Sequence, residues 1–514
     1  MSPGPTSAAL LALPAVGTLG ASAERVGVVL AALLAAVAVL APARAELKRV
    51  RDPAMLGALV LTPVLLVADI WGSPQIRPLR HHPLIGVLAL LVVAGAVALV
   101  TLALRRRPEL FAPLVVAALP FRLPISSGST TSNLLIPLYL VVAAGVLAHL
   151  LTREPARPSP PPIGRLEAAL MGFVVLYAAQ AAYSSDFTKA LEQVVFFYVP
   201  FALLFALLRQ VRWTPHLLAT CLAVAVGLAL VFVAIGFVEY SRRELLLNPK
   251  VIASNQVESY FRVNSLFFDP SIYGRFLALV MILLTGALLW WRRTRDIALA
   301  GAVLAALWGG LVLSFSQSSI GALLLGLATL AAWRFSMRAT VAVSVAAVIA
   351  GAGLLLIAPR TLHFHLGSTR STQNTTSGRY GLVKGGLALF ADRPLQGFGP
   401  GSFAREYRRR QHASTEGAVS ASHTIALTVA AEQGVVGLAL YLVLLVAAFG
   451  RLFGRARGSP VRVAVGAAFA ALVLHTLLYA AFLEDPLTWT LLGVGVALAA
   501  VPAQARGVPE GLSA

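Results

Sequence analysis

Long apolar stretches, separated by short basic or polar turns, make up most of this chain. Many of these stretches reach the roughly 20 residues that one helix needs to cross a bilayer. In lipid, a helix satisfies its own backbone hydrogen bonds. We therefore predict an all-α, polytopic integral membrane protein with about 14–16 membrane spans. The predicted spans are 26–43, 54–71, 84–104, 110–121, 134–151, 166–183, 190–208, 215–240, 272–291, 297–314, 319–333, 339–358, 435–450, 463–483 and 487–503.

Basic residues gather in every second turn, and this pattern predicts the orientation of the chain. Because cytoplasmic loops are enriched in Lys and Arg, we predict that the turns with these clusters are cytoplasmic. The turns 183–189, 314–319 and 484–486 are poor in basic residues and are predicted to be external. On the same count, the two longest interruptions, 241–271 and 359–422, are external. The basic clusters are Arg44, Lys48, Arg49 and Arg51; Arg105, Arg106 and Arg107; Arg153, Arg157 and Arg165; Arg209 and Arg212; Arg292, Arg293 and Arg295; Arg334 and Arg338; and Arg451, Arg455, Arg457 and Arg462.

The longest interruption divides the chain into three predicted parts: membrane spans over 1–358, a large external loop over 359–422, and membrane spans over 423–514. The loop carries nine Lys or Arg residues against three acidic residues. Because the external loop at 241–271 also has an excess of Arg, an anion-binding site is one explanation. The other explanation is that long loops cross the membrane regardless of their charge.

A short amphipathic helix is predicted inside the long loop, lying on the external membrane surface. Tyr380, Val383, Leu387 and Phe390 recur at helical spacing after Ser377, which is a suitable N-cap residue. A proline that follows this run ends the predicted helix.

Arg379 falls in the first turn of that helix, where the helix dipole favours an anion over a cation. A phosphate bound at the helix N-terminus would make a cation favourable at this position, and the Arg379 guanidinium would bind two oxygens of the phosphate. A solvated surface arginine explains the position equally well. After the helix, Gly397, Gly399 and Gly401 flank Pro400, which predicts a flexible turn and not a nucleotide-binding fingerprint.

His423 stands where the long loop re-enters the membrane. With an unperturbed pKa of about 6.5, an imidazole is largely neutral at pH 7 and can act as a general base. A helix-capping or packing histidine is the alternative. His475 lies inside a span and is expected to hydrogen-bond a neighbouring helix. No Cys, His or Asp cluster has the spacing of a metal site, so we expect no metal and no cofactor.

Composition changes this picture little. The chain is 58% hydrophobic and 12% charged, and its net charge of +20 is explained by the basic turns of a membrane protein, without a nucleic-acid partner. Cys221 is the single cysteine, so no intrachain disulfide is possible. The high content of Ala, Arg, Gly and Val is typical of a high-GC bacterium.

Three segments resemble the O-antigen ligase and polymerase superfamily. Residues 377–380 (Ser-Gly-Arg-Tyr) and 389–401 (Leu-Phe-Ala-Asp-Arg-Pro-Leu-Gln-Gly-Phe-Gly-Pro-Gly) are similar to its external-loop signature. His423 and the following Glu-x-Gly-x-x-Gly at 432–437 are similar to its histidine and trailing helix. Residues 262–270 (Arg-Val-Asn-Ser-Leu-Phe-Phe-Asp-Pro) are similar to its first arginine segment. The chain departs from the family pattern in having Thr after the histidine instead of Asn, and Asp-Pro-Ser instead of His-Pro-Asn.

The resemblance implies transfer of a glycan from a polyprenyl-diphosphate carrier, such as undecaprenyl diphosphate, to a hydroxyl of a glycolipid or glycan acceptor. It implies that Arg262 and Arg379 stabilise the diphosphate leaving group and that His423 accepts the hydroxyl proton, in a metal-independent, inverting displacement. It also implies a multi-pass protein of the bacterial inner or plasma membrane, in contact with membrane lipids, whose active site is extracytoplasmic. The predicted substrate-binding residues are Lys384, Arg275 and Glu432.

Two other classes of protein remain as alternatives. A metal-dependent lipid-phosphosugar glycosyltransferase needs an acidic residue in an external loop, and Asp186 is the best candidate. A lipid-linked oligosaccharide flippase or other transporter is expected to place ionisable groups along a central path. Asp69, Glu192, Glu239 and His475 are the few such groups in the spans, and most lie near span ends. The sequence does not distinguish a ligase from a polymerase.

Overall fold

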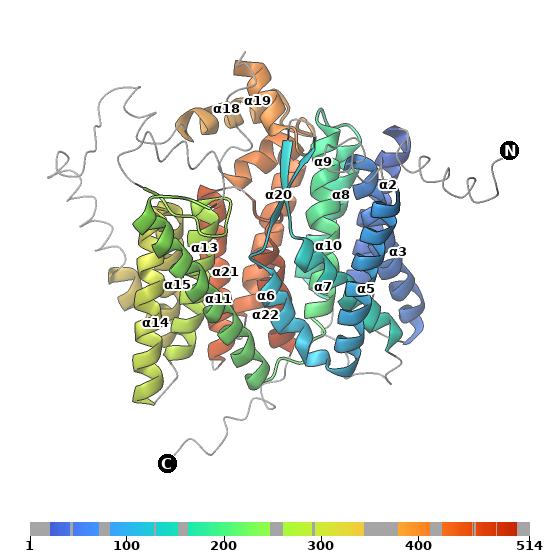
Figure 1. Ribbon diagram of the computed structural model, residues 1–514. Helices are drawn as coiled ribbons and strands as arrows, with labels where there is room; N and C mark the ends of the chain where they lie inside the picture. The colour runs from blue at the N-terminus through green and yellow to red at the C-terminus, as the bar shows by residue number, and fades with distance from the viewer. Residues whose placement is uncertain are drawn as a thin grey trace. The chain divides into compact units, whose positions relative to one another are not determined.

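The computed structural model describes residues 21–41, 45–70, 83–127, 130–152, 163–246, 261–289, 293–343, 379–411, 424–454, 456, 459–479 and 481–500. Within these ranges, nine helices are long and apolar enough to cross a membrane, and three shorter helices are also apolar. The predicted fold class, an α-helical polytopic membrane protein, is confirmed (Figure 1). The elements are α2 (Ala21–Leu40), α3 (Ala45–Ile70), α5 (Pro83–Arg106), η2 (Pro108–Leu110), α6 (Phe111–Ala118), β1 (Leu123–Ser127), β2 (Thr130–Leu134), α7 (Ile136–Leu151), α8 (Arg165–Ala181), α9 (Phe187–Gln193), η3 (Val194–Tyr198), α10 (Val199–Leu208), α11 (Pro215–Arg242), α13 (Pro270–Leu288), α14 (Thr294–Leu313), α15 (Gln317–Arg334), α18 (Arg379–Asp392), α19 (Phe403–Gln411), α20 (Ile425–Phe453), α21 (Pro460–Leu478) and α22 (Pro486–Ala500).

The predicted spans that fall in the described ranges lie on these helices. The predicted span at 339–358 lies mostly outside the described residues. A small sheet between α6 and α7 was not predicted: β1 pairs with β2 in antiparallel register, from Leu123 opposite Leu134 to Ser127 opposite Thr130. This hairpin is the one departure from helix and turn in the described ranges.

Contacts between residues divide the chain into two compact units. Unit 1 comprises Met1–Cys221, Gly399–Ser402 and Leu483–Ala514, and unit 2 comprises Leu222–Phe398 and Phe403–Phe482. The segment at 359–422, predicted to be one external loop, therefore contributes to both units. The three-part division of the sequence concerns the sides of a membrane and stays a prediction.

Helix α10 forms the centre of unit 1, and each of its residues is buried. It packs against α2, α7 and α22, and Trp489 of α22 lies edge-on to Phe201 with ring centroids 6.5 Å apart. Before α10 the helix widens into the π-turn η3. Pro200 has no N–H to donate to the preceding turn, and the Tyr139 hydroxyl donates to Phe196 O at 2.6 Å instead. A side chain of α7 thus satisfies backbone that the proline leaves open.

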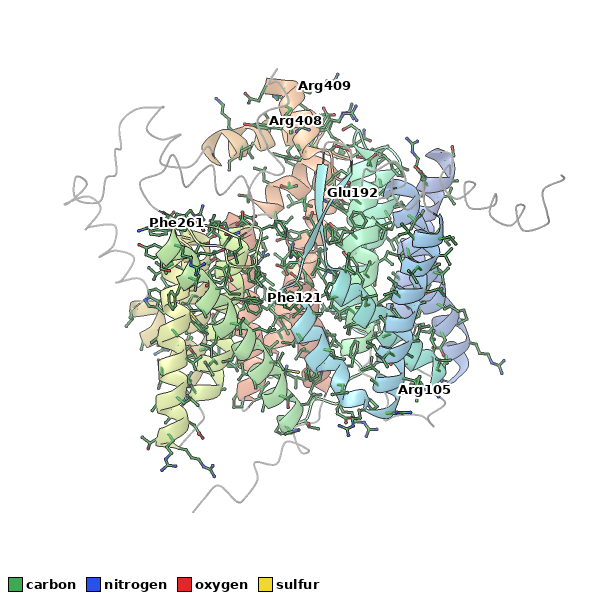
Figure 2. The ribbon with its side chains drawn as sticks, in the orientation of Figure 1. Arg105, Phe121, Glu192, Phe261, Arg408 and Arg409 are labelled. Atoms are coloured by element: carbon green, nitrogen blue, oxygen red, sulfur yellow. The ribbon has the colours of Figure 1, made fainter. Side chains whose placement is uncertain are left out.

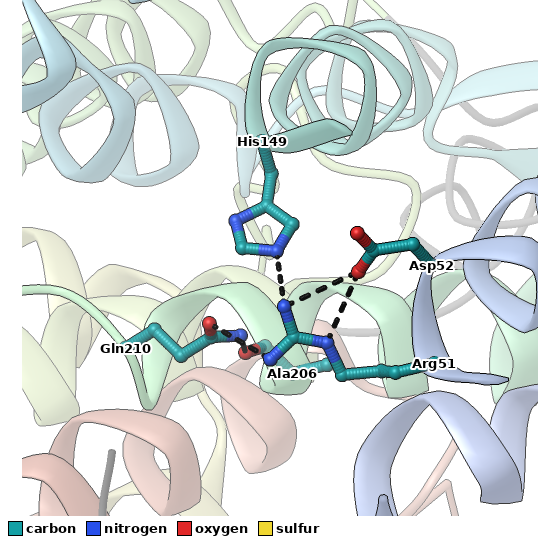
Figure 3. A network of polar contacts seen from close by, with 5 residues as sticks. All are labelled: Arg51, Asp52, His149, Ala206 and Gln210. Carbon is teal, nitrogen blue, oxygen red and sulfur yellow. Dashed lines mark hydrogen bonds and ion pairs between the residues drawn. The ribbon is translucent and has the colours of Figure 1, made fainter. Parts of the chain in front are cut away.

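A polar network surrounds Arg51 in unit 1 (Figure 3). The Arg51 guanidinium donates to Asp52 Oδ1 at 3.3 Å and to Gln210 Oε1 at 3.5 Å, and its Nη2 lies 2.6 Å from His149 Nε2. Because a guanidinium can only donate, His149 Nε2 must be the acceptor in this contact. The arrangement therefore holds His149 without a proton on Nε2.

Two more arginines of the predicted cytoplasmic clusters close helix ends. In unit 1, Arg209 pairs with Glu167 at 3.4 Å and donates to Val39 O, in the last turn of α2, at 3.0 Å. In unit 2, Arg462 donates to Gly454 O, at the end of α20, at 2.6 Å. Carbonyl groups at a helix C-terminus have no partner inside the helix and attract cations. The residues that predict topology therefore also cap helices.

In unit 2, helices α14, α15 and α21 pack against α13. The start of α13 and the end of α14 lie at the same end of the unit, because Val263 N donates to Leu313 O at 3.1 Å. The turn at 314–319 follows at that end. These segments are the ones that the charge pattern predicts to be external, whereas Arg462 lies at the other end of α21.

Candidate functional site

Arg262 precedes α13, and its side chain contacts the backbone of the turn that follows α14. Its Nε donates to Ser314 O at 3.2 Å, and its side chain is half-buried. Figure 2 shows its neighbour Phe261 towards the same end of unit 2 as Arg408 and Arg409 of α19. The first predicted site residue is therefore fixed at the end of the unit that carries the predicted external segments.

Glu239, near the end of α11, anchors the Arg262 segment. Its Oε2 accepts from Ser265 N at 2.8 Å and Asn264 N at 3.3 Å, and its Oε1 accepts from Leu246 N at 3.1 Å. The carboxylate is 2% exposed, and Ser265 has a φ of 51°, which favours glycine. From the sequence, Glu239 was identified only as an ionisable residue near the end of a span, and its contacts with the Arg262 segment were not predicted. No signal in a single sequence links it to residues 264 and 265.

Replacing Glu239 by alanine is expected to destabilise the protein by at least about 3 kcal/mol, because three backbone N–H groups lose their acceptor at about 1–3 kcal/mol each. Thermal unfolding in detergent measures the loss, and amide hydrogen exchange should rise at Asn264 and Ser265. Glu239→Gln keeps one acceptor oxygen, so its stability should lie between that of wild type and that of Glu239→Ala. Glu244→Ala, which removes an exposed acid four residues beyond Tyr240, is the control. Equal effects of the Glu239 and Glu244 substitutions would contradict the anchoring role.

Helix α18 confirms the helix predicted in the long loop, but a different face of it packs on the protein. The buried residues of α18, which packs against α19 and α20, are Leu382, Gly385, Gly386 and Leu389. Val383 is 36% exposed and Leu387 is 55% exposed. Two of the four residues of the predicted apolar stripe, Val383 and Leu387, therefore face away from the protein, whereas Phe390 is partly buried. The contact of this stripe with a membrane surface stays a prediction.

Arg379 is the first residue of α18, as the helix start predicted from the sequence requires. Lys384, on the same helix, is exposed. Arg275 is in the second turn of α13 and is only 1% exposed. A ligand of Arg275 would therefore have to enter the protein, whereas Lys384 is open to solvent. The binding roles of these residues stay predictions.

The segment after α18 forms a clasp with α20. The two pieces of backbone that cross in this clasp belong to the family-like segments 389–401 and 432–437. Val435 N donates to Pro394 O at 2.7 Å, and Phe398 N donates to Ala431 O at 3.1 Å. Gly434 interrupts α20 with φ 67° and ψ −164°, and a Cβ there would lie 2.2 Å from Leu395 O. Gly397, in the turn that was predicted to be flexible, packs against the same crossing, since a Cβ there would lie 2.2 Å from Glu432 O. The flexibility of this turn stays a prediction.

Glu432 closes the start of α19. Its Oε1 accepts from Phe403 N at 3.0 Å, and its side chain is 6% exposed. A carboxylate at a helix N-terminus satisfies an unpaired donor and interacts favourably with the helix dipole. The described contact of Glu432 is thus within the protein. Its predicted role in substrate binding stays untested.

His423 lies outside the described residues, and Thr424, which follows it, is the N-cap position of α20. The side chain of Arg379 is likewise not described. The convergence of Arg262, Arg379 and His423 therefore stays a prediction. The expectation for His475 is confirmed: its Nε2 lies 3.2 Å from Ser319 Oγ of the neighbouring helix α15.

A second polar cluster lies in unit 1, where two predicted external turns meet. Gln193 Nε2 donates to Glu484 Oε1 at 2.6 Å, and Lys189 Nζ donates to Glu192 Oε2 at 2.8 Å. Figure 2 shows Glu192 towards one end of this unit and Arg105 at the other. Burial raises the pKa of the Glu484 carboxyl, although the charge of Lys189 acts in the opposite direction.

The raised pKa makes the stability of the protein depend on pH. The unfolded carboxyl ionises near pH 4.3, and the folded one ionises at a higher pH. Stability contributed by protonated Glu484 is therefore present at low pH and is lost as the pH rises from about 4.3 to the folded pKa. Glu484→Gln should lose less stability over this window in thermal unfolding at a series of pH values. Glu109→Gln, at an exposed acid of unit 1, should keep the wild-type slope. A Glu484→Gln slope equal to that of wild type would contradict this.

In the part of the chain that the structure describes, no three His, Cys, Asp or Glu side chains are grouped so that they could hold a metal ion. Asp186, the acid considered for metal-dependent chemistry, is the N-cap of α9, and its Oδ1 accepts from Lys189 N at 3.3 Å. The described bond of Asp186 is therefore a helix cap.

Residues 300–442 match the protein family described as O-antigen ligase. No curated protein matches the chain. The family match confirms the resemblance found in the sequence. Of the predicted site residues, the matched range contains Arg379, Lys384, His423 and Glu432, and Arg262 and Arg275 precede it.

Proposed function

We propose that this protein, whose membership of the O-antigen ligase superfamily is supported by the match at residues 300–442, transfers a glycan from a polyprenyl-diphosphate carrier to an acceptor hydroxyl on the external face of the membrane. The family match is the observation that carries the proposal, since an O-antigen ligase domain implies a lipid-linked glycan and a glycan acceptor. The protein is a multi-pass membrane protein, so a donor with a lipid tail has access to it from the bilayer.

The proposed reaction is a single displacement at the anomeric carbon. The acceptor oxygen forms a bond to this carbon, the bond from the carbon to the diphosphate oxygen breaks, and its electron pair stays on the diphosphate. His423 takes the proton of the attacking hydroxyl, and the configuration inverts. Arg262 and Arg379 stabilise the charge that develops on the leaving group. The hydrogen bond from Arg262 Nε to Ser314 O supports this role, because it holds the guanidinium in place before the donor binds.

The test is a turnover assay with purified protein and a defined carrier-linked donor, in detergent and in the presence of EDTA. We expect product with an inverted anomeric linkage, and little effect of chelation. Strong metal dependence would instead favour a lipid-phosphosugar glycosyltransferase. A pure flippase would form no product in detergent, where there are no two compartments. Supplying either a second carrier-linked chain or a separate glycolipid as acceptor distinguishes a polymerase from a ligase.

A further inference from the structure

A buried polar cluster adjoins the turn that holds Arg262. It consists of Ser316, Ser318 and Ser319 at the start of α15 and His475 near the end of α21, and each is at most 3% exposed. His475 Nε2 lies 3.3 Å from Ser318 Oγ and 3.2 Å from Ser319 Oγ, and Ser316 Oγ lies 2.7 Å from Ser319 Oγ. Buried polar groups cost free energy unless they are hydrogen-bonded, so an apolar side chain would pack here more simply. The cluster therefore fixes a geometry in addition to filling space.

The imidazole is held by polar contacts and not by packing alone. Ser319 Oγ donates to Ser271 O at 3.2 Å, and the same hydroxyl lies 3.2 Å from His475 Nε2. Ser318 Oγ lies 3.3 Å from the same ring nitrogen. The position thus needs a hydrogen-bonding group of the right reach, not only a ring of the right volume.

The cluster connects the two backbone segments that frame Arg262. Ser271 is in the first turn of α13, which begins directly after the Arg262 segment. On the other side, Ser316 N donates to Ser314 Oγ at 3.3 Å, and Ser314 O is the acceptor of Arg262 Nε. Moving the Ser319 hydroxyl would shift the start of α13 relative to the turn, and with it the guanidinium.

We infer that His475 is a positioning residue for Arg262: through Ser319 and Ser316 it sets where the Arg262 guanidinium meets the diphosphate of the donor. The inference rests on the proposed function, in which Arg262 binds that diphosphate. His475 itself touches neither substrate nor reacting atoms.

A double-mutant cycle tests this role. His475→Phe keeps an aromatic ring and removes the nitrogen that contacts the two serines, and it should lower kcat/KM for the carrier-linked donor about 10- to 100-fold, the scale of a misplaced catalytic group. His475→Gln keeps a side-chain amide that can donate to or accept from the serine hydroxyls, and it should stay within about threefold of wild type. In the Arg262→Ala background, His475→Phe should change kcat/KM by less than about twofold, because coupled residues are not additive. Loss of packing alone would give the same factor in both backgrounds and would overturn the inference, as would equal effects of Phe and Gln.

His149→Phe is the matched control, since it makes the same exchange at the histidine bonded to Arg51 in unit 1. Its effect should be the same factor with and without Arg262. Binding of farnesyl diphosphate to protein in nanodiscs separates the inference from the proposed function. If wild type binds this probe but makes no product, the proposed function fails; weaker binding in both His475→Phe and Arg262→Ala still supports the inference, and wild-type binding by His475→Phe overturns it.

Discussion

Replacing Arg262 by alanine is expected to lower turnover of the carrier-linked donor by at least about 10²-fold, the scale for removing one preorganised charge stabiliser. The leaving diphosphate gains negative charge as the glycosidic bond breaks, and a fixed guanidinium stabilises it without reorganising. Because the interaction strengthens in the transition state, kcat should fall together with kcat/KM. Initial rates over a range of donor concentrations measure both quantities.

Two further substitutions separate this role from simple charge. Arg262→Lys keeps the positive charge but loses the planar fork and the Nε bond to Ser314 O, so it should recover only part of the activity. Arg243→Ala removes an exposed arginine that lies over the Tyr240 ring at 4.3 Å, directly after the end of α11. It should leave turnover within about threefold of wild type, as expected for a surface charge. If Arg243→Ala and Arg262→Ala were equally impaired, a general attraction of anions would replace the specific site.

The helices were predictable because membrane spans are set by one local quantity. A run of apolar residues needs no tertiary partner to be identified, so helices such as α5 and α20 fall where the sequence predicts them. The helix α18 was predictable from its spacing for the same reason. Its buried face was not, because Leu382 and Leu389 pack on partners that are distant in the sequence and that no periodicity reveals.

The site residues illustrate the same limit. Arg262 and Arg379 stand out because arginine is unusual in a predicted external loop, and the quoted segments gave them a family context. Glu239 carries no such signal, although it holds the backbone beside Arg262 through three acceptor contacts. The glycines after α18 indicate a turn, but the crossing with α20 that uses Gly434 depends on a contact about 40 residues along the chain. Contacts of this kind require the fold.

Replacing Gly434 by alanine is expected to open the clasp that α20 forms with the segment after α18. The backbone there has φ 67° and ψ −164°, a region accessible essentially only to glycine, and a Cβ would lie 2.2 Å from Leu395 O. Strain of about 1–3 kcal/mol and a similar cost of overpacking both fall on the native clasp. Amide hydrogen exchange across α18 should rise, and glycan transfer should fall at least about tenfold, because α18 carries Arg379 in its first turn.

The matched control is Gly450→Ala in the same helix, where a Cβ has no neighbour within 4 Å. Alanine is the better helix former by about 1 kcal/mol, so this variant should be as stable as wild type or more stable, with unchanged exchange in α18. Both variants replace a glycine of α20 by alanine. They differ in that another backbone segment crosses the helix at Gly434 but not at Gly450. Wild-type exchange and activity in Gly434→Ala would mean that the Arg379 helix keeps its place without the clasp, and the link between the two family-like segments would then have no role in positioning the site.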